Sequence, residues 1–505
     1  MADQFALLVA DVPLAAGNVD YTDPRITDFR GAMVAISGDY LGEGSSAQVL
    51  LALFTKDDGA NTSHGHVTTY YRAGSTASSF ARHAARTSSG GTDILRVLDP
   101  ATAGSDWATG TVSDLSNGFR VNWTNVAGLS AGRRVKMVVL LFGGSTMHGG
   151  SGSENVAFFT GDTLLQVLAL SKRGGFGSLT NDTSIGVGGA AKGSPDEQAE
   201  VCLTWPTAAN PTTAGEAAGA SNLQGRVNSA AGAPTTLEQD ALSAFTTTGY
   251  SRSSSVVGTF FLGFEWVDDR TPHVELVDLT GSESGPTLLG TGFVGIPEVV
   301  VGVFVGATSE DSVVTGAAAQ QVGFFFTDGF LVASVSMAMG AGQAVAGGTP
   351  TVAFSRFKQG EWNVVSGAGG TALRISSVTV TDGGLLLDFA TAKAGRLLLW
   401  GVSRIPALEP SAVPVALALP APTRLVASAQ IPTSVHLALA LPTPTVVAPK
   451  VPSAVALPLV VPAPTVFRPA IPTPEAPPPD LGPLYAEALA SLLPRGLAWP
   501  RRPVS

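Results

Sequence analysis

The chain has 505 residues, which at about 100–200 residues per domain suggests roughly three domains. Only 13% of the residues are charged and 45% are hydrophobic, which excludes a chain that is disordered throughout. The net charge of −10 provides no electrostatic reason to bind nucleic acid or anionic lipid. We therefore expect neither kind of partner.

The cysteine content and the apolar segments further limit the kinds of protein that this chain could be. Cys202 is the single cysteine, so the chain has no intrachain disulfide framework. The opening "MADQFALLVADVPLAAG" lacks the basic start of a secretory signal. No window of 18 apolar residues is free of proline and charge, so we expect no membrane insertion. Production in the cytoplasm, followed by assembly into a larger structure, is the expected route.

Residues 1–405 contain segments that echo one another. Each has an apolar strand ending at glycine, a loop of small residues, and a second strand that closes on Phe-Thr before an Asp/Gly turn. The three copies are residues 31–59, 137–162 and 298–329, and their shared ends are Phe54-Thr55, Phe159-Thr160 and Phe326-Thr327. Such a repeat indicates a modular protein.

A second repeated sequence pattern lies at the end of the units. Residues 116–144 and 381–403 each read as a turn, an alternating strand, a loop with a basic residue and a final apolar strand, and residues 249–266 are a weaker copy. Apolar residues at period two indicate half-buried strands: Val121, Trp123, Leu385, Leu387 and Phe389.

These patterns predict a mainly β protein made of antiparallel, jelly-roll-like β-sandwiches. We place the units at residues 1–145, 146–270 and 271–405. The strand at 137–142 fits both the end of the first unit and the start of the second. A single domain over the first 270 residues is therefore an alternative. Residues 236–245, "TLEQDALSAF", are the one weak candidate for a helix in this region.

Five short motifs within these repeated segments resemble those of a known group of proteins. The motifs are Gly306-Ala307, Asp328-Gly329, Gly118-Phe119, Trp123-Thr124 and Gly143-Gly144. In this respect residues 10–405 resemble the β-sandwich modules of tail and fibre proteins from tailed bacteriophages and prophages. The resemblance implies a structural role in a virion.

Residues 406–479 form a proline-rich repeat of three blocks. In each block four apolar residues alternate before a proline, and Pro-x-Pro-Thr follows. The alternating residues are Val413, Val415, Leu417 and Leu419, then Val435, Leu437, Leu439 and Leu441, then Val455, Leu457, Leu459 and Val461. Alternation places these side chains on one face of a short strand, and recurrent proline excludes a membrane helix.

One such face needs a partner surface, because each aliphatic side chain left exposed to water loses the roughly 1.5–3 kcal/mol of stabilisation that burial would contribute. We favour a homotrimeric β-shaft, in which several chains wrap together. A polyproline-like tether and a solenoid within one chain remain alternatives. Similar "ALALPAPT" repeats occur in phage tail proteins, which agrees with the resemblance above.

Residues 480–505 predict a short amphipathic helix that acts as a docking peptide. Its apolar residues and terminal tryptophan are Tyr485, Leu489, Leu492, Leu493 and Trp499. A helix of about ten residues is not stable alone and usually lies in a groove. The pattern is similar to the opening of Mu-type phage tail and baseplate-assembly proteins, where it stands at the N-terminus. Docking onto other tail or baseplate proteins is therefore implied, with packing on its own subunit as the alternative.

No pattern predicts a catalytic, cofactor or metal site. His64, His66 and His83 lack an acidic or cysteine partner at ligand spacing. The stretch "HGGSGSE" at 148–154 does not meet the nucleophile-elbow pattern and indicates a loop. Acidic pairs such as Glu310-Asp311 are expected on solvated turns. Of the tryptophans, Trp107 is the one expected on an exposed loop, where it could stack on a sugar.

The expected function is thus that of a structural virion protein without enzymatic activity. It would be a tail-fibre or baseplate-associated subunit, located in the virion tail, that attaches to the host surface or to neighbouring subunits by multivalent binding. A host surface glycan is a further expected partner. The alternatives are a head-decoration protein and a polysaccharide-degrading tailspike-type enzyme.

Overall fold

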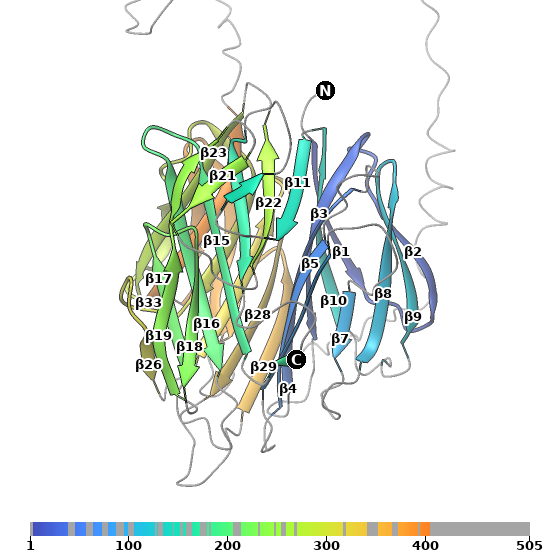
Figure 1. The fold of residues 1–505 in the computed structure, drawn as a ribbon, viewed down its shortest axis with the longest axis horizontal. Coiled ribbons are helices and arrows are strands. Elements are labelled where there is room, and N and C mark those ends of the chain that lie inside the picture. Colours follow the sequence, from blue (N-terminus) through green and yellow to red (C-terminus); the bar gives the residue numbers. More distant parts are fainter. Residues whose placement is uncertain are drawn as a thin grey trace, which may run out of the picture. The chain divides into compact units, whose positions relative to one another are not determined.

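The computed structural model describes residues 4–404 apart from a set of short stretches. Those stretches are 39–45, 57–63, 73–78, 87–94, 99–105, 127–128, 130–134, 145, 152–154, 158–163, 172–178, 181–182, 206–213, 231–232, 247–248, 254–258, 267–269, 317–319, 341–351, 366–371 and 392–393. Met1–Val415 is one compact unit and Ala416–Ser505 a second, which lies outside the described residues. The described chain is built of antiparallel strands and contains no helix (Figure 1), so the predicted mainly β sandwich fold is confirmed. The predicted C-terminal helix lies outside the described residues.

The first sandwich has a large and a small sheet. The large sheet contains, in spatial order, β1 (Gln4–Asp11), β10 (Val135–Gly143), β3 (Phe29–Gly38), β4 (Ser46–Thr55), β5 (His64–Arg72) and β6 (Ser79–Arg86). The small sheet contains β2 (Gly17–Thr22), β9 (Gly118–Asn125), β8 (Asp106–Leu115) and β7 (Leu95–Leu98).

The second sandwich repeats this plan with a divided small layer. Its large sheet contains β11 (Thr146–Ser151), β22 (Thr259–Glu265), β13 (Gln166–Ser171), β15 (Thr183–Ala191), β16 (Glu197–Trp205) and β17 (Ala214–Gly219). The small layer consists of β12 (Asn155–Ala157), β21 (Gly249–Arg252) and β20 (Leu242–Phe245), beside the pair β18 (Gln224–Ala230) and β19 (Ala233–Asp240).

The third sandwich has the same order as the first. Its large sheet contains β23 (Arg270–Thr280), β33 (Ala394–Arg404), β25 (Ile296–Val305), β27 (Gln320–Thr327), β28 (Val332–Gly340) and β29 (Val352–Gln359). Its small sheet contains β24 (Gly285–Leu289), β32 (Gly384–Phe389), β31 (Ala372–Thr381) and β30 (Trp362–Val365).

All three large sheets therefore place the first strand of the sandwich at the edge, the last strand beside it and the third strand next. This order resolves the ambiguity at residues 137–142. They belong to β10, which pairs with β1 and β3 and so closes the first sandwich. The segment of the second sandwich that corresponds to 31–59 is β13 with β15, not the predicted copy at 137–162.

Short strands also cross between the sandwiches. β14 (Leu179–Thr180), from the loop that follows β13, pairs with β6 of the first sandwich. β26 (Val314–Gly316), from the loop that follows β25, pairs with β17 of the second sandwich. Each of these loops thus extends the large sheet of the preceding sandwich by one short strand.

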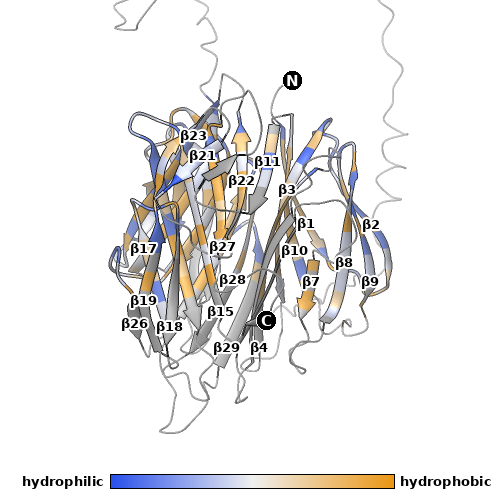
Figure 2. Ribbon diagram, in the orientation of Figure 1, coloured by the Kyte–Doolittle hydropathy of each residue, from blue (hydrophilic) through white to orange (hydrophobic). Residues whose placement is uncertain are grey.

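The large sheets are buried on both faces. In β3, Met33 and Ala35 belong to a core shared by all three sandwiches, whereas Val34 and Ile36 belong to the core inside the first sandwich. A strand buried on both faces must be apolar at every position, which explains runs such as "MVVLLF" in β10 and "LLLW" in β33. Figure 2 shows hydrophobic stretches along β10 and β22, while several turns at the strand ends are hydrophilic.

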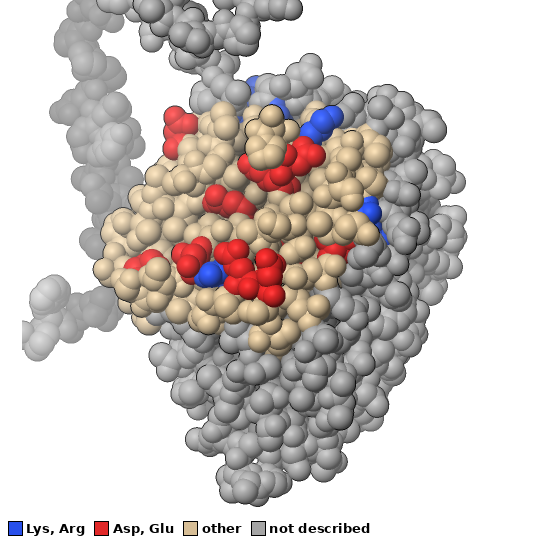
Figure 3. All heavy atoms as spheres, turned by 60° about the vertical axis from the view of Figure 1, so that its left-hand side comes forward, with Lys and Arg blue, Asp and Glu red and all other residues tan. Residues whose placement is uncertain are grey.

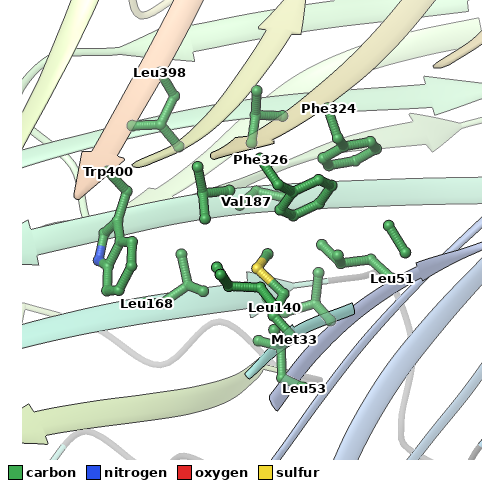
Figure 4. Close-up of a cluster of buried hydrophobic side chains, with 14 of the residues drawn as sticks. Met33, Leu51, Leu53, Leu140, Leu168, Val187, Phe324, Phe326, Leu398 and Trp400 are labelled. Carbon is green, nitrogen blue, oxygen red and sulfur yellow. The ribbon is translucent and has the colours of Figure 1, made fainter. Parts of the chain in front are cut away.

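The shared core joins residues far apart in the chain. Figure 4 shows side chains from the three large sheets turned toward one another: Met33, Leu51, Leu53, Leu140, Leu168, Val187, Phe324, Phe326, Leu398 and Trp400. Fully burying an aliphatic or aromatic side chain contributes about 1.5–3 kcal/mol. Separating the sandwiches would expose many such groups, at a cost that exceeds the usual 5–15 kcal/mol stability of a domain. The three sandwiches consequently fold as one body.

The pairs Phe54-Thr55 and Phe326-Thr327 end β4 and β27, as predicted. Phe54 lies in the core of the first sandwich and Phe326 in the shared core, so the two rings occupy opposite faces of their sheets. The weak expectation of a helix is wrong. Residues 236–245 form β19 and β20 rather than a helix. The extended chain lets the Asp240 carboxylate reach the Arg252 guanidinium at 2.8 Å.

The shared core predicts a large effect of truncating Trp400. Trp400→Ala should lower the free energy of unfolding by about 3–5 kcal/mol, because the indole is fully buried among side chains of all three sandwiches. Chemical denaturation measures the change. Leu288→Ala, on an outer strand and 46% exposed, is the control and should change stability by less than about 1 kcal/mol. An equally small loss for Trp400→Ala would contradict the shared core.

Candidate functional site at the junction of the sandwiches

Five aromatic rings meet where the three sandwiches join. Phe142 on β10, Phe264 on β22 and Trp400 on β33 come from the last strands of the three sandwiches. Their ring centroids lie 5.3 Å (Phe142–Phe264), 6.5 Å (Phe142–Trp400) and 5.0 Å (Phe264–Trp400) apart. Phe5 and Trp266 extend the group, with 5.8 Å between their centroids. Edge-to-face and tilted pairs at these distances stabilise the contact beyond simple burial.

A glycine makes room for the largest of these rings. A Cβ atom on Gly189 would lie 2.6 Å from Cδ1 of Trp400, so a larger residue in β15 would displace the indole. The Trp400 Nε1–H then donates to the Val167 carbonyl at 3.1 Å. The indole of Trp400, from the third sandwich, is thus held against the second sandwich by the space at Gly189 and by its N–H hydrogen bond to Val167.

The carboxylate of Asp328 joins the third sandwich to the first. Its side chain is fully buried, and its Oδ2 accepts the backbone N–H of Leu7 at 2.9 Å and lies 2.9 Å from Nη1 of Arg25. Leu7 is on β1, an edge strand. Since an edge strand presents unpaired N–H groups, Asp328 satisfies one of them from the neighbouring sandwich.

Glu197 makes the equivalent contact between the second and third sandwiches. Its Oε2 accepts the backbone N–H of Val274, on the edge strand β23, at 2.9 Å. The same oxygen lies 2.7 Å from Nδ1 of His273, and Nε2 of that ring lies 3.3 Å from Glu275. Burial disfavours the charged imidazole, but the carboxylates of Glu197 and Glu275 outweigh it and raise the pKa of His273 to about 9. His273 is therefore a cation at neutral pH.

A buried amide completes this second junction. Gln166 on β13 accepts a hydrogen bond from Trp266 Nε1 at 2.7 Å. Its Nε2 donates to the Gly401 carbonyl at 2.8 Å and to the His273 carbonyl at 3.2 Å. A fully buried amide is tolerated only when its groups are bonded. The Gln166 carbonyl is bonded within the second sandwich, and its Nε2 is bonded twice across the junction to the third.

A further carboxylate is buried within the second sandwich. Glu200 on β16 is fully buried, and its Oε1 accepts a hydrogen bond from Gln239 at 2.8 Å. The same Gln239 nitrogen donates to Asp311 at 2.8 Å. Burial raises the pKa of Glu200 to about 8, a shift that Gln239 reduces and Asp311 increases. Glu200 is thus largely protonated at neutral pH.

One outer face of the body is acidic. Figure 3 shows several groups of Asp and Glu on this face and few Lys or Arg. On the third sandwich Arg396 is ion-paired with Asp278 and lies 3.7 Å from Glu310. The Arg396 side chain is largely buried, whereas the carboxylates of Asp278 and Glu310 are exposed on this surface.

The residues predicted to pack a shaft and a docking peptide all lie outside the described residues. They are Val413, Val415, Leu417, Leu419, Val435, Leu437, Leu439, Leu441, Val455, Leu457, Leu459 and Val461, and Tyr485, Leu489, Leu492, Leu493 and Trp499. Those assignments stay predictions.

Trp107 is placed differently from its prediction. It lies on β8 and is only 6% exposed, so it is a core residue and not a loop platform for sugar. Trp123, Trp266, Trp362 and Trp400 are likewise buried. Cys202 is buried, as predicted, and burial raises the pKa of its thiol.

His64 and His66 lie on β5 and His83 lies on its neighbour β6, where His83 is paired with Val67. The side chains of these three histidines are not among those that the structure describes. Across the described ranges, no group of three or more His, Cys, Asp or Glu side chains is arranged to hold a metal ion. The "HGG" of the expected loop at 148–154 belongs to β11. Within the same ranges, no helix is long and apolar enough to cross a membrane.

The junction residues were missed at the sequence level. Asp328 was noted only as part of a turn motif, and Glu197, Gln166 and His273 were assigned no role. Their function depends on which edge strand lies beside them, and no local pattern carries that information. The nearest signal was an Asp-Gly turn after an apolar strand, which marks where a carboxylate could reach a neighbouring element.

No protein-family model matches the chain, and no curated protein matches it either.

Replacing Asp328 tests the first junction. Asp328→Asn should lower the free energy of unfolding by about 3–5 kcal/mol, because it removes the buried charge that pairs with Arg25 and turns an amide donor toward existing donors. Thermal and urea denaturation measure the loss. Asp382→Asn, on the exposed turn between β31 and β32, is the matched control and should be nearly neutral. Equal stability of the two variants would contradict the role of Asp328 at the junction.

Stability should fall as the pH rises from 5 to 9. The folded pKa of Glu200 (about 8) and of His273 (about 9) both exceed the ordinary values of 4.5 and 6.5. The folded state then binds more protons than the unfolded state, so each group lowers stability by up to about 1.4 kcal/mol per pH unit between its two pKa values.

Urea denaturation of variants across this range separates the two groups. Glu200→Gln should flatten the slope between pH 5 and 8, and His273→Gln should flatten it between pH 6.5 and 9. Curves that run parallel to the wild type would show that neither group titrates as described.

Proposed function

We propose that this protein is a structural virion protein of a tailed phage, either a tail-fibre or a baseplate-associated subunit. In this role it attaches to the host surface or to neighbouring subunits by multivalent binding. Its place would be the virion tail, after assembly in the host cytoplasm, and its partners would be other tail or baseplate proteins. The proposal assigns no catalytic role and no cofactor to the chain.

The observation that best supports the proposal is the shared core. Three sandwiches of the same strand order are locked together by apolar packing and by the Asp328 and Glu197 contacts. A body of this kind holds its surface loops at fixed positions relative to one another. Fixed loops suit multivalent attachment, because several weak contacts that can form together give high avidity.

The remainder of the chain supports an assembled role. The alternating apolar residues of 406–479 need a partner surface, which a homotrimeric shaft would provide. The terminal segment at 480–505 resembles a docking peptide of tail proteins. The proposal therefore assigns attachment of the subunit to the C-terminal part and outward contacts to the sandwich body.

Two exposed features of the body are compatible with contact to other macromolecules, namely its acidic face (Figure 3) and Phe330, which is 85% exposed. The buried tryptophans weigh against a sugar platform built from those rings. A host glycan stays a proposed partner, with its contact surface unassigned.

The experiment is to purify particles from the source that carries the gene and to locate the protein by mass spectrometry and immunogold electron microscopy. The expected result is the protein on the tail. Its absence from particles would overturn the proposal. Its location on the head would favour decoration instead, and release of reducing sugar from host polysaccharide would favour an enzyme.

Deletion of residues 480–505 tests the docking role of the C-terminal peptide. The truncated chain should fold normally, because the sandwich body ends near Arg404, but its incorporation into particles should fall to background. Quantitative mass spectrometry of purified particles measures incorporation. A deletion confined to the proline-rich blocks that leaves 480–505 in place is the comparison, and it should retain docking. Normal incorporation of the truncation would contradict the proposal.

A further inference from the structure

Four large apolar side chains are exposed at one end of the third sandwich. We call Val294, Ile296, Phe330 and Leu331 the rim patch; they are 52%, 44%, 85% and 40% exposed. The turn that carries Phe330 lies beside the start of β25, since a Cβ on Gly329 would be 3.7 Å from the Glu298 carbonyl. The rim patch is thus formed by the start of β25 with the loop before it and by the neighbouring turn after β27. Single exposed apolar residues are ordinary, but a group on adjacent segments marks an interaction site.

The backbone holds Phe330 in a fixed position. Oδ1 of Asp328 accepts the N–H of Phe330 at 3.1 Å and the N–H of Leu331 at 2.9 Å. Gly329 has a φ of 81°, which favours glycine there. Because the other oxygen of the same carboxylate is bonded to the first sandwich, the turn is tied to the junction. An aromatic ring presented on an ordered turn loses little entropy when it binds.

Arg25 adds a charged group beside the ring. Its guanidinium carbon lies 5.8 Å from the Phe330 centroid. Nε and Nη2 are directed at Asp23, and Nη1 at Asp328. A guanidinium carries five N–H donors, so these contacts among described residues leave donors on the terminal nitrogens for a further acceptor. The Arg25 side chain is 39% exposed, which makes those donors reachable.

The chemistry of the rim patch fits a protein partner better than a sugar. Three of its four residues are aliphatic, and aliphatic surface is buried favourably only against other apolar groups. A glycan would lose water from its hydroxyl groups on such a surface without gaining hydrogen bonds. Buried aromatic and arginine side chains are, in contrast, the commonest energetic centres of protein interfaces.

The position of the rim patch indicates which partner it meets. Ile296 is paired in register with Arg404, the last described residue. The last described residue therefore lies at the same end of the sandwich as the rim patch. Under the proposed function the residues that follow Arg404 attach the subunit, so the rim patch lies at the end of the body where the attachment segment begins.

We propose that the rim patch is a docking surface for a neighbouring protein subunit of the assembled particle. The partner inserts an apolar side chain beside Phe330 and Leu331 and places a carboxylate on Arg25. This inference rests on the proposed function, and it adds a second contact that is independent of the C-terminal peptide.

The test is site-specific photocrosslinking in assembled particles. Full-length chain carrying benzoylphenylalanine in place of Phe330 is incorporated into particles, irradiated and digested, and crosslinked peptides are identified by mass spectrometry. The expected product joins position 330 to a different virion protein, at a peptide with an apolar residue next to Asp or Glu. The same probe at Leu14, which is 47% exposed on the loop after β1, is the control and should not give that product.

Crosslinks to residues 405–505 of the same chain, to a second copy, or to host polysaccharide alone would overturn the inference. So would a yield at position 330 no higher than at position 14. If neither labelled chain is found in particles, the proposed function fails instead, and the two failures are thereby distinguished.

Substitution gives a second measurement. Phe330→Ser should reduce binding of the full-length chain to particles that lack it by tenfold or more, whereas Phe330→Leu should retain most of it. The unfolding midpoints of both variants should equal that of the wild type, because the ring is largely exposed. Leu14→Ser is the matched control. Wild-type binding by Phe330→Ser would overturn the inference.

Discussion

The hydrophobic core shared by the three large sheets is the constraint on which the rest of the structure depends. A sheet in a sandwich needs one apolar face, but here each large sheet has two. The second face stays out of water only if the other two sandwiches are present. This requirement accounts for the low charge and high apolar content of a chain that has no membrane-spanning helix in its described residues. It also explains why no sandwich is a separate domain in the energetic sense.

Apolar packing alone does not fix how the sandwiches are oriented, and the polar contacts supply that orientation. Asp328 and Glu197 each satisfy a backbone N–H of an edge strand in the neighbouring sandwich. Gln166 is bonded to Trp266, the residue after β22, and to carbonyls on β23 and β33. A displaced sandwich would leave the Asp328 carboxylate and the Gln166 amide buried without these partners, at a cost of about 1–3 kcal/mol each. The body consequently has one arrangement. A single arrangement is what fixed binding loops require under the proposed role.

The alternating and continuous apolar patterns were enough to predict strands, sandwiches and a mainly β fold. Val121, Trp123 and Leu387 are buried on the strands where period two placed them. The copy at 137–162 was wrong because β10 is as apolar as a starting strand, and only its pairing with β1 and β3 shows that it closes a sandwich. Trp107 and the junction residues could not be placed, since their surroundings come from strands distant in sequence. Phe330 followed a recognisable turn, but its exposure depends on the neighbouring loop.

The central claim is that three sandwiches of one chain form a single cooperative body around a shared core. Native-state hydrogen exchange measured by mass spectrometry tests it most directly, because it reports the opening free energy of each strand separately. The decisive peptides are those covering β10, β22 and β33, the last strand of each sandwich. The account predicts that their slowest amides open with the same free energy, equal to that of global unfolding. If one of these strands exchanged at a markedly lower free energy while the other two stayed protected, the sandwiches would be independent and the account would be contradicted.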